Sequence, residues 1–467
     1  MVFKFAKITY SLSLVIFFFT ITTNGQSNGL AFNTEEKGDK TEVKHFLNLL
    51  AGTDIVAQGN SFAYIEKNWK PEYEIMVLEL MYFNSNNDLS IKLAVLLQKK
   101  TGKEFGYDFN EWYEWLWNKD QKLHPDYHYF KAKLHNYIDN KFGKYFLDRQ
   151  DKTIIRFDEI RWGGVRQDGI PPLRNPEMIS PEKATYLEDN NIVFGIEVNG
   201  DARAYPKRIL AWHEMFTDNV GGIPVTGVYC TLCGTVILYK DIYKGVQHTF
   251  GTSGFLYRSN KLMYDKATQS LWNTHWGKPV VGPLVGKGIE LEYMSVVTTT
   301  WGEWKKRHPN TSVLSLNTGH RRDYGEGIAY KDYFATDELM FNVPSTDKKL
   351  KHKQSILAIK LLDHPGEEVA ISVKFLKKNP VYSYKIGNTN LVVLTDKTGA
   401  NRVYETKGTI ITSFDQNTIV RDNLGGSWTL TEDKLINTTG KVLQRVPTYN
   451  AFWFGWKAAY PDTVLIK

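Results

Sequence analysis

The stretch VTGVYCTLCGTVILY, residues 225–239, holds Cys230 and Cys233, the two cysteines of the chain. Apolar and β-branched residues lie on both sides of the pair and Gly234 follows it, a pattern that predicts a strand, a turn and a second strand. A spacing of three residues across a turn places both sulfurs on one side, close enough for a disulfide or a shared metal ion. Because a bridge over so small a loop adds little stability, the pair indicates redox exchange or metal binding more than a structural bridge.

Outward from this stretch, the sequence divides into two regions of different character. Residues 155–467 alternate short β-rich runs such as IVFGIEV and TVILY with turns, and two helices are expected near 206–216 and 301–308. Residues 40–150 instead carry apolar residues at helical spacing, as in EYEIMVLELMYF, which predicts an array of short helices resembling a repeat. We therefore expect an α+β protein with an all-α, helical-repeat-like region followed by a β-rich domain.

The β-rich domain repeats itself along the sequence. WKKRHPNTSVL at residues 304–314 matches WKAAYPDTVL at residues 456–465, and further pairs of segments keep the same order. The repeat predicts a first half at 192–316, a connector at 317–353 and a second, degenerate half at 354–467.

The second half serves as an internal comparison for the cysteines. CTLCGTVILY aligns without a gap on TDKTGANRVY, so Cys230 falls on Thr395 and Cys233 on Thr398. Packing alone therefore does not require the thiols, which disfavours the interpretation that they are only small buried side chains. Any chemistry is expected in the first half.

His213 and Glu214, in the segment WHEMF, are expected on the helix that precedes the cysteine strand. An imidazole beside a thiol lowers the thiol pKa, and a carboxylate orients the imidazole or acts as a base. The alternatives are an ordinary core or surface histidine and an exposed helix carboxylate. Together with Cys230 and Cys233, His213 would also supply three metal ligands and leave one position open, as in catalytic zinc or copper sites.

The polar segment SGFLYRSNKLMYDKATQSLW supplies candidates for a substrate pocket. These are Arg258, Ser259, Asn260 and Asp265. Asp265 has a counterpart, Asp422, in the second half, which favours a structural role for it.

The N-terminus has the order of a secretory signal. Lys4 and Lys7 precede the apolar run ITYSLSLVIFFFTIT, and polar residues follow. We expect residues 1–25 to direct export to a periplasmic or extracellular location; the alternative is a retained N-terminal anchor. The run is shorter than the roughly 20 residues of a membrane span, and no stable span is expected after cleavage. A net charge of +7 over 467 residues is mild and indicates no nucleic-acid partner.

Three dense motifs resemble a known family. They are GDARAYPKRILAWHE, GGIPVTGVYCTLCGTVILY and SGFLYRSNKLMYDKATQSLW, and they resemble the domain of unknown function 3179 family over residues 155–467. The sequence departs from the family at SLWNTHWG, where SLWSQ-like residues are expected. The family has no established activity. Some of its members are described as selenoproteins with selenocysteine in the CxxC-type motif, so the resemblance implies redox or nucleophilic chemistry at Cys230 or Cys233.

Three functional hypotheses follow from these patterns. The first is an exported thiol-dependent oxidoreductase acting on a small molecule or a protein thiol, in which one cysteine attacks, the other resolves and His213 tunes the thiolate. The second is a metal-binding protein or metalloenzyme that holds zinc or copper with the same residues. The third is a non-enzymatic binding or scaffold protein with an incidental disulfide.

Overall fold

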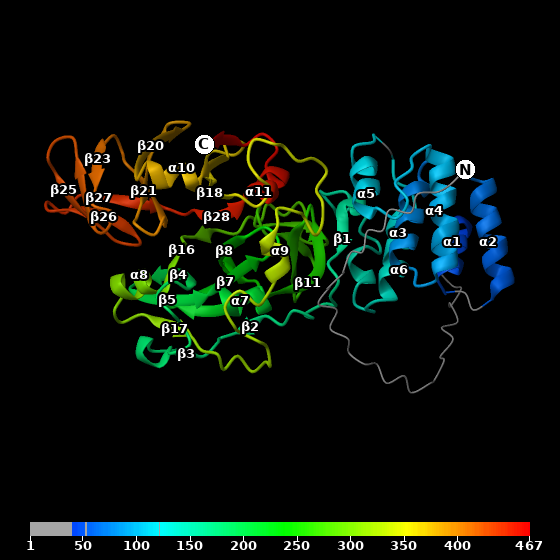
Figure 1. Cartoon of the computed structure of the whole chain (residues 1–467), viewed down its shortest axis with the longest axis horizontal. Helices are drawn as coiled ribbons and strands as arrows, with labels where there is room; N and C mark the ends of the chain where they lie inside the picture. Colours follow the sequence, from blue (N-terminus) through cyan, green and yellow to red (C-terminus); the bar gives the residue numbers. More distant parts are fainter. Residues whose placement is uncertain (1–39, 52–53, 121) are drawn as a thin grey trace. The chain divides into compact units, whose positions relative to one another are not determined.

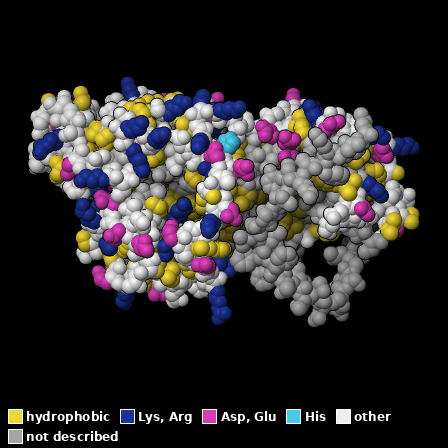
Figure 2. Space-filling view, in the orientation of Figure 1, with side chains coloured by type: hydrophobic (Ala, Val, Ile, Leu, Met, Phe, Trp, Pro, Cys, Tyr) yellow, Lys and Arg dark blue, Asp and Glu magenta, His cyan; other side chains and the backbone are white. Residues whose placement is uncertain are grey.

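The computed structural model describes residues 40–51, 54–120 and 122–467 of the chain. The expected export signal, residues 1–25, lies outside the described residues. None of the helices within them is long and apolar enough to cross a bilayer. Basic and acidic side chains are interspersed over the face shown in Figure 2, in keeping with the mild net charge.

The α+β class predicted from the sequence is confirmed, with helices first and strands after them (Figure 1). The N-terminal helices are α1 (Thr41–Ala51), α2 (Ile55–Lys67), α3 (Tyr73–Phe83), α4 (Asn87–Thr101), α5 (Phe109–Trp117) and α6 (Tyr127–Asn136). Asn86 caps α4 by accepting from backbone N–H groups, and Gly102 ends it in a left-handed conformation at φ 70°. The α3 helix is buried over residues 73–81 and contacts α1, α4, α5 and α6.

The cysteine stretch forms the predicted strand, turn and strand within a five-stranded sheet. The strand order is β15-β8-β7-β6-β2. The bounds are β2 (Leu173–Arg174), β6 (Met215–Val220), β7 (Ile223–Cys230), β8 (Thr235–Lys240) and β15 (Tyr293–Met294). β7 and β8 are antiparallel, and their pairing ends at Cys230 opposite Thr235. Cys230 therefore closes β7 and Cys233 lies in the turn.

A second five-stranded sheet joins the helices to the cysteine region. Its order is β1-β11-β12-β13-β14. The bounds are β1 (Ile160–Trp162), β11 (Phe250–Tyr257), β12 (Asn260–Asp265), β13 (Leu271–Asn273) and β14 (Lys278–Val281). Phe255 on β11 and Leu262 on β12 belong to the same buried cluster as Phe46 and Phe130 of the helices. The helices thus pack on one face of this sheet. The turn between β11 and β12 contacts Cys233.

Two further sheets share one strand order. They are β16-β4-β5-β17, with β3 at its edge, and β28-β18-β19-β29. The first contains β3 (Met178–Ile179), β4 (Ile192–Val198), β5 (Asp201–Pro206), β16 (Val297–Thr300) and β17 (Ser312–Leu314); the second contains β18 (Ser355–Ile359), β19 (Val369–Ser372), β28 (Tyr449–Phe452) and β29 (Val464–Ile466). In both, the first three strands pair antiparallel and the last pairs parallel to the third.

Short helices occupy matching places in these two sheets. α7 (Lys207–His213) follows β5 and α10 (Val373–Lys378) follows β19, while α8 (Trp301–Arg307) follows β16 and α11 (Trp453–Ala459) follows β28. α7 and α8 lie where helices were predicted. The connector holds α9 (Lys331–Ala335).

The remaining described strands form an eight-stranded sheet and a small ribbon. The order of the large sheet is β20-β21-β22-β27-β26-β25-β24-β23. Its bounds are β20 (Val381–Ile386), β21 (Thr389–Thr395), β22 (Asn401–Glu405), β23 (Ile411–Phe414), β24 (Ile419–Asp422), β25 (Ser427–Leu430), β26 (Lys434–Asn437) and β27 (Val442–Val446). The ribbon consists of β9 (Ile242–Tyr243) and β10 (Val246–Gln247), and short 3-10 helices lie at Gly143–Tyr145, Phe157–Glu159 and Pro181–Lys183.

Candidate functional site

The turn between β7 and β8 holds the two thiols side by side. Cys230 and Cys233 are free, approach to 3.4 Å, and are 3% and 0% exposed. A hydrogen bond from the Gly234 N–H to the Thr231 carbonyl (3.3 Å) closes the turn. Gly234 has φ 57°, and a Cβ atom there would lie 2.7 Å from the ring of Phe452, so this position requires glycine.

The β11–β12 hairpin supplies polar contacts to Cys233. Arg258 and Ser259 form its two-residue turn and are both left-handed, with φ values of 49° and 63°, as in a type I′ hairpin. The Cys233 thiol donates to the Ser259 carbonyl oxygen at 3.3 Å. Asn260 Nδ2 donates to Cys233 Sγ at 3.6 Å. Two of the four residues predicted for the substrate pocket thus contact the second thiol.

The other two predicted residues are engaged in holding the fold. Arg258 pairs with Glu159, with Nε 2.5 Å from Oε2, and donates from Nη1 to the Ala458 carbonyl at 3.1 Å. Asp265 Oδ2 hydrogen-bonds with His248 Nδ1 at 2.8 Å. The structural role that the repeat favoured for Asp265 agrees with this contact.

Glu214 is a charged side chain that hydrogen-bonds directly to the turn holding the thiols, through Thr231. The α7 helix ends at His213, and Glu214 takes a left-handed conformation at φ 54° before β6 begins, so it does not lie on the helix as predicted. Its Oε1 accepts from the hydroxyls of Thr231 (2.8 Å) and Tyr330 (2.9 Å). Its Oε2 lies 2.5 Å from Lys261 Nζ, and both side chains of this pair are 7% exposed.

His213 contacts a different set of residues. Its Nδ1 hydrogen-bonds with the Pro171 carbonyl at 2.8 Å and its Nε2 with the Tyr324 hydroxyl at 2.6 Å. Burial lowers the pKa of His213 to about 4, and nearby His320 adds to this effect, so the ring is neutral at neutral pH. A neutral ring with both nitrogens engaged elsewhere does not perform the predicted thiolate tuning. The left-handed turn at Glu214, which periodicity does not reveal, separates the two neighbours.

The thiols have opposite pKa shifts. Burial raises the pKa of Cys230, but the neighbouring Cys233 thiol and the backbone N–H groups of Lys261 and Cys233 outweigh it and hold this pKa below its ordinary value. Glu214 opposes them. Burial raises the pKa of Cys233 well above its ordinary value, and the neighbouring Cys230 thiolate adds to the rise. Cys230 is therefore the more readily ionised thiol of the pair.

The three-ligand metal arrangement expected from Cys230, Cys233 and His213 does not form. In residues 40–51, 54–120 and 122–467, no group of three or more His, Cys, Asp or Glu side chains is placed to hold a metal ion. The two sulfurs are adjacent, but the imidazole is bonded to Pro171 and Tyr324.

Lys261 and Tyr330 complete the site and were not among the predicted residues. Lys261 is the one lysine of the strand NKLMYD, all of which is buried. Because lysine is almost never buried without a partner, it was a signal in the sequence for a buried ion pair. Tyr330 lies in the connector, 116 residues from its partner Glu214. No local pattern points to so distant a contact.

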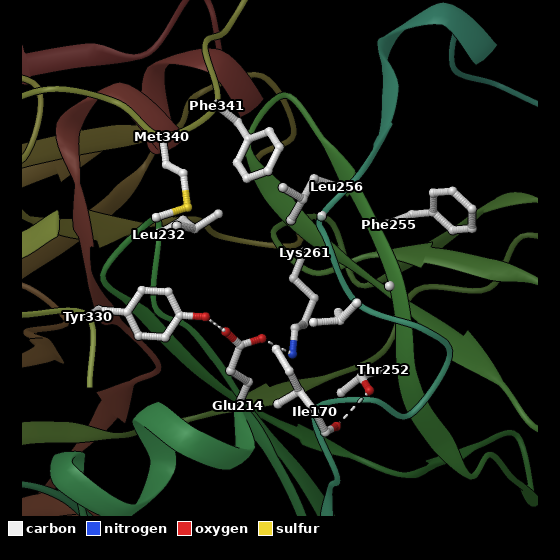
Figure 3. Close-up of a pocket in the computed structure, with 13 residues that line it drawn as sticks. Ile170, Glu214, Leu232, Thr252, Phe255, Leu256, Lys261, Tyr330, Met340 and Phe341 are labelled. Atoms are coloured by element: carbon white, nitrogen blue, oxygen red, sulfur yellow. Dashed lines mark hydrogen bonds and ion pairs between the residues drawn. The ribbon is translucent and has the colours of Figure 1, made fainter. Parts of the chain in front are cut away.

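A cavity of about 60 Å³ opens beside Glu214 and Lys261 (Figure 3). Its polar end is formed by Glu214, Lys261 and Tyr330, and its apolar walls include Leu232, Leu256, Met340 and Phe341. Leu232 lies between the two cysteines in sequence, and the Lys261 N–H bonds to Cys230. Neither cysteine is among the lining residues, but two residues that are, Leu232 and Lys261, neighbour the thiols in sequence or by a hydrogen bond.

A family model described as "Protein of unknown function (DUF3179)" matches residues 167–463. Neither the curated proteins nor the solved structures gave a match. The matched range includes the cysteine turn, Glu214, Lys261 and Tyr330, whereas the helices α1 to α6 lie outside it. The thiol turn and the polar end of the cavity thus lie within the matched residues, whereas the lining residues Gly163 and Val165 precede them.

Proposed function

The chain belongs to the DUF3179 family, and we propose that it is a thiol-dependent oxidoreductase whose redox centre is the Cys230–Cys233 pair. One observation carries the proposal: two free, buried thiols approach to 3.4 Å, and their pKa values shift in opposite directions. A redox dithiol needs one thiolate to attack and one thiol to resolve. The opposite shifts suit Cys230 to the attacking role and Cys233 to the resolving role.

In the proposed reaction, the Cys230 thiolate attacks the substrate and the Cys233 thiol then attacks the oxidised Cys230 to form the disulfide. The dithiol loses two electrons and two protons and becomes a disulfide, while the substrate gains both. The sulfurs move from 3.4 Å to the bond length of about 2.05 Å, which the turn accommodates without a large displacement. A small-molecule or protein thiol then regenerates the dithiol by exchange.

The surroundings of the turn assist this reaction in distinct ways. Asn260 donates to Cys233 Sγ, which opposes the rise of this pKa and helps the second thiol to ionise when it attacks. Hydrogen bonds from Tyr333 to the Leu232 carbonyl (2.7 Å) and from the Phe452 N–H to the Cys233 carbonyl (2.7 Å) fix the turn. A fixed turn keeps the sulfurs adjacent in both redox states.

The export expected from residues 1–25 belongs to the same proposal. A periplasmic or extracellular dithiol would meet an oxidising environment and need a thiol partner to stay reduced. Detection of the mature protein outside the cytoplasm, with a new N-terminus near residue 25, tests this part.

Two further features of the fold are also proposals: the duplication of the β-rich domain and the helical-repeat character of the N-terminal region. Duplication of the β-rich domain is supported by the shared strand order of the two four-stranded sheets and by two matched tryptophans. Trp304 Nε1 donates to Thr311 Oγ1 and Trp456 Nε1 to Thr463 Oγ1, both at 2.9 Å. The helical-repeat character has no such support, because α3 contacts four other helices whereas a repeat contacts only its neighbours.

Thiol counting on protein purified without reductant tests the redox proposal. Oxidation by diamide should remove both thiols together, with the loss of two hydrogen atoms in the intact mass, and dithiothreitol should restore them. Cys230→Thr and Cys233→Thr supply matched controls, because Thr395 and Thr398 stand at the aligned positions. Two thiols that survive excess diamide in the folded protein would rule out the redox pair.

A further inference from the structure

The cavity beside the thiols is polar at one end and apolar elsewhere. In Figure 3 the side chains of Glu214, Lys261 and Tyr330 converge at one end, and Met340 and Phe341 lie toward the other. A ligand that fits these walls has an apolar body and one polar group, since a buried polar group without a partner is costly.

Lys261 is the side chain at this end with hydrogen-bonding capacity to spare. Its Nζ forms an ion pair with Glu214 at 2.5 Å, yet none of its N–H groups makes a well-aligned hydrogen bond although the atom is buried. Glu214, in contrast, accepts from Thr231 and Tyr330 in addition to the ion pair. An ammonium group has three donors and no acceptor, so the ligand must supply an acceptor atom.

The charges favour an uncharged ligand. Glu214 already balances Lys261 at the polar end, so an anion would face the carboxylate and a cation would face the ammonium. The size is also bounded, because about 60 Å³ accommodates on the order of five water-sized positions. The polar group is therefore a neutral acceptor on a body of a few heavy atoms.

The neighbouring dithiol limits the substrate to a neutral acceptor group that two thiols can reduce. A carbonyl oxygen is a suitable acceptor, but dithiols are not oxidised to disulfides by simple carbonyl compounds. A hydroperoxide is also reducible, but it carries an O–H donor in addition to its acceptor oxygens, whereas the group with hydrogen-bonding capacity to spare at this end is the donor Lys261. A dialkyl sulfoxide is uncharged, has a strong acceptor oxygen and no donor, and is reducible by two thiols.

We propose that the cavity binds a small dialkyl sulfoxide as the substrate of the redox pair, with its oxygen on Lys261 Nζ; the substrate assignment rests on the proposed thiol function. The substrate oxygen passes to the Cys230 thiolate with uptake of one proton, which releases the dialkyl sulfide and leaves a sulfenic acid. The Cys233 thiol condenses with the sulfenic acid, forming the S–S bond and releasing water. In sum, one sulfoxide and two thiols give one sulfide, one disulfide and one water.

The test uses a pair of five-membered rings of nearly equal shape. Tetrahydrothiophene 1-oxide is a sulfoxide that thiols can reduce, and sulfolane is the sulfone, with acceptor oxygens but resistant to thiols. Pre-reduced full-length protein, freed of reductant under argon, is titrated with each by ligand-observed NMR. The same samples are analysed for tetrahydrothiophene by gas chromatography and for the protein's intact mass.

We expect both rings to bind, and only the sulfoxide to yield tetrahydrothiophene, one molecule per disulfide formed. The double variant Lys261→Met with Glu214→Gln keeps the site neutral and should bind the sulfoxide at least about tenfold more weakly, as for loss of a hydrogen bond from a charged donor. Lys360→Met with Glu290→Gln is the matched control. It removes a different ion pair, at 2.7 Å, whose side chains are 11% and 28% exposed and whose lysine also donates to the Trp276 carbonyl. This control should bind and reduce like the wild type.

The outcomes separate this inference from the proposed function. Reversible oxidation by diamide without sulfoxide binding, or binding without tetrahydrothiophene, would overturn the inference and leave the redox pair standing. Thiols inert to diamide would overturn the proposed function. Binding that persists in Cys230→Thr with Cys233→Thr, with reduction abolished, supports a substrate cavity that is separate from the thiols. Equal binding by the Lys261 double variant would remove Lys261 from the site.

Discussion

Two glutamate–lysine pairs in this chain have the same length and differ in burial. Lys261 Nζ lies 2.5 Å from Glu214 Oε2, and both side chains are 7% exposed. Lys240 Nζ lies 2.5 Å from Glu292 Oε1, with side chains 34% and 60% exposed. Removing one partner of a buried pair leaves an uncompensated charge and costs about 3–5 kcal/mol, whereas an exposed pair contributes about 0–1 kcal/mol. We expect Lys261→Met to lower the free energy of unfolding by about 3–5 kcal/mol, and Lys240→Met by less than about 1 kcal/mol.

Urea unfolding followed by tryptophan fluorescence measures both variants under the same conditions. Adding Glu214→Gln to Lys261→Met should recover most of the loss, because no buried charge remains and the amide oxygen can still accept from Thr231 and Tyr330. Equal, small losses for Lys261→Met and Lys240→Met would refute the view that the Glu214 pair is desolvated. The polar end of the cavity would then be solvated, and the inference that an uncharged acceptor binds Lys261 there would no longer hold.

Three further predictions concern the surroundings of the thiols. Gly234→Ala places a Cβ atom 2.7 Å from the Phe452 ring on a backbone with φ 57°, and we expect it to lower the free energy of unfolding by about 2–5 kcal/mol in urea titrations. Gly200→Ala is the control, because φ there is 83° but nothing lies within 4 Å of the added Cβ; it should cost about 1–2 kcal/mol. The pKa of His213 is about 4 in the folded protein and 6.5 in the unfolded chain, so the unfolded state takes up the proton first and the wild type loses stability as pH falls from about 6.5 to about 4. His213→Gln removes this group, and its stability should therefore fall less over the same pH range. Thermal melts from pH 7 to 4 measure the difference. Asn260→Leu removes the hydrogen bond that lowers the pKa of the second thiol, so disulfide formation by diamide at pH 7 should slow; an unchanged rate contradicts that role.

The local elements around the cysteines could be read from the sequence. The β-branched runs beside CTLC and the glycine after it specify a strand, a turn and a strand, and β7 and β8 form there. Ser259 and Asn260 were selected because they lie in a polar segment that the second half does not retain, and the type I′ turn of the β11–β12 hairpin brings them to Cys233. Short-range pattern was sufficient for the strands and the turn because each is defined by its own residues, whereas the contacts of Ser259 and Asn260 with Cys233 span 26 and 27 residues.

The prediction that Glu214 lies on the same helix as His213 was wrong for a physical reason. Helical spacing suggested that His213 and Glu214 share a helix and act together, but one left-handed residue at Glu214 sends the two side chains to different partners. Lys261 and Tyr330 were missed because their roles depend on tertiary contacts. Sequence periodicity records which residues are buried on an element, and it does not record which distant element they meet.

The order in which the two cysteines react tests the central claim most directly. Pre-reduced protein is alkylated with iodoacetamide at pH values from 5 to 10, and peptide mass spectrometry measures the rate at each cysteine. The account predicts that Cys230 is alkylated first, with a midpoint below the ordinary cysteine pKa, and that Cys233 reacts only at higher pH. Faster alkylation of Cys233, or identical pH profiles for both, would contradict the assignment of Cys230 as the attacking thiolate.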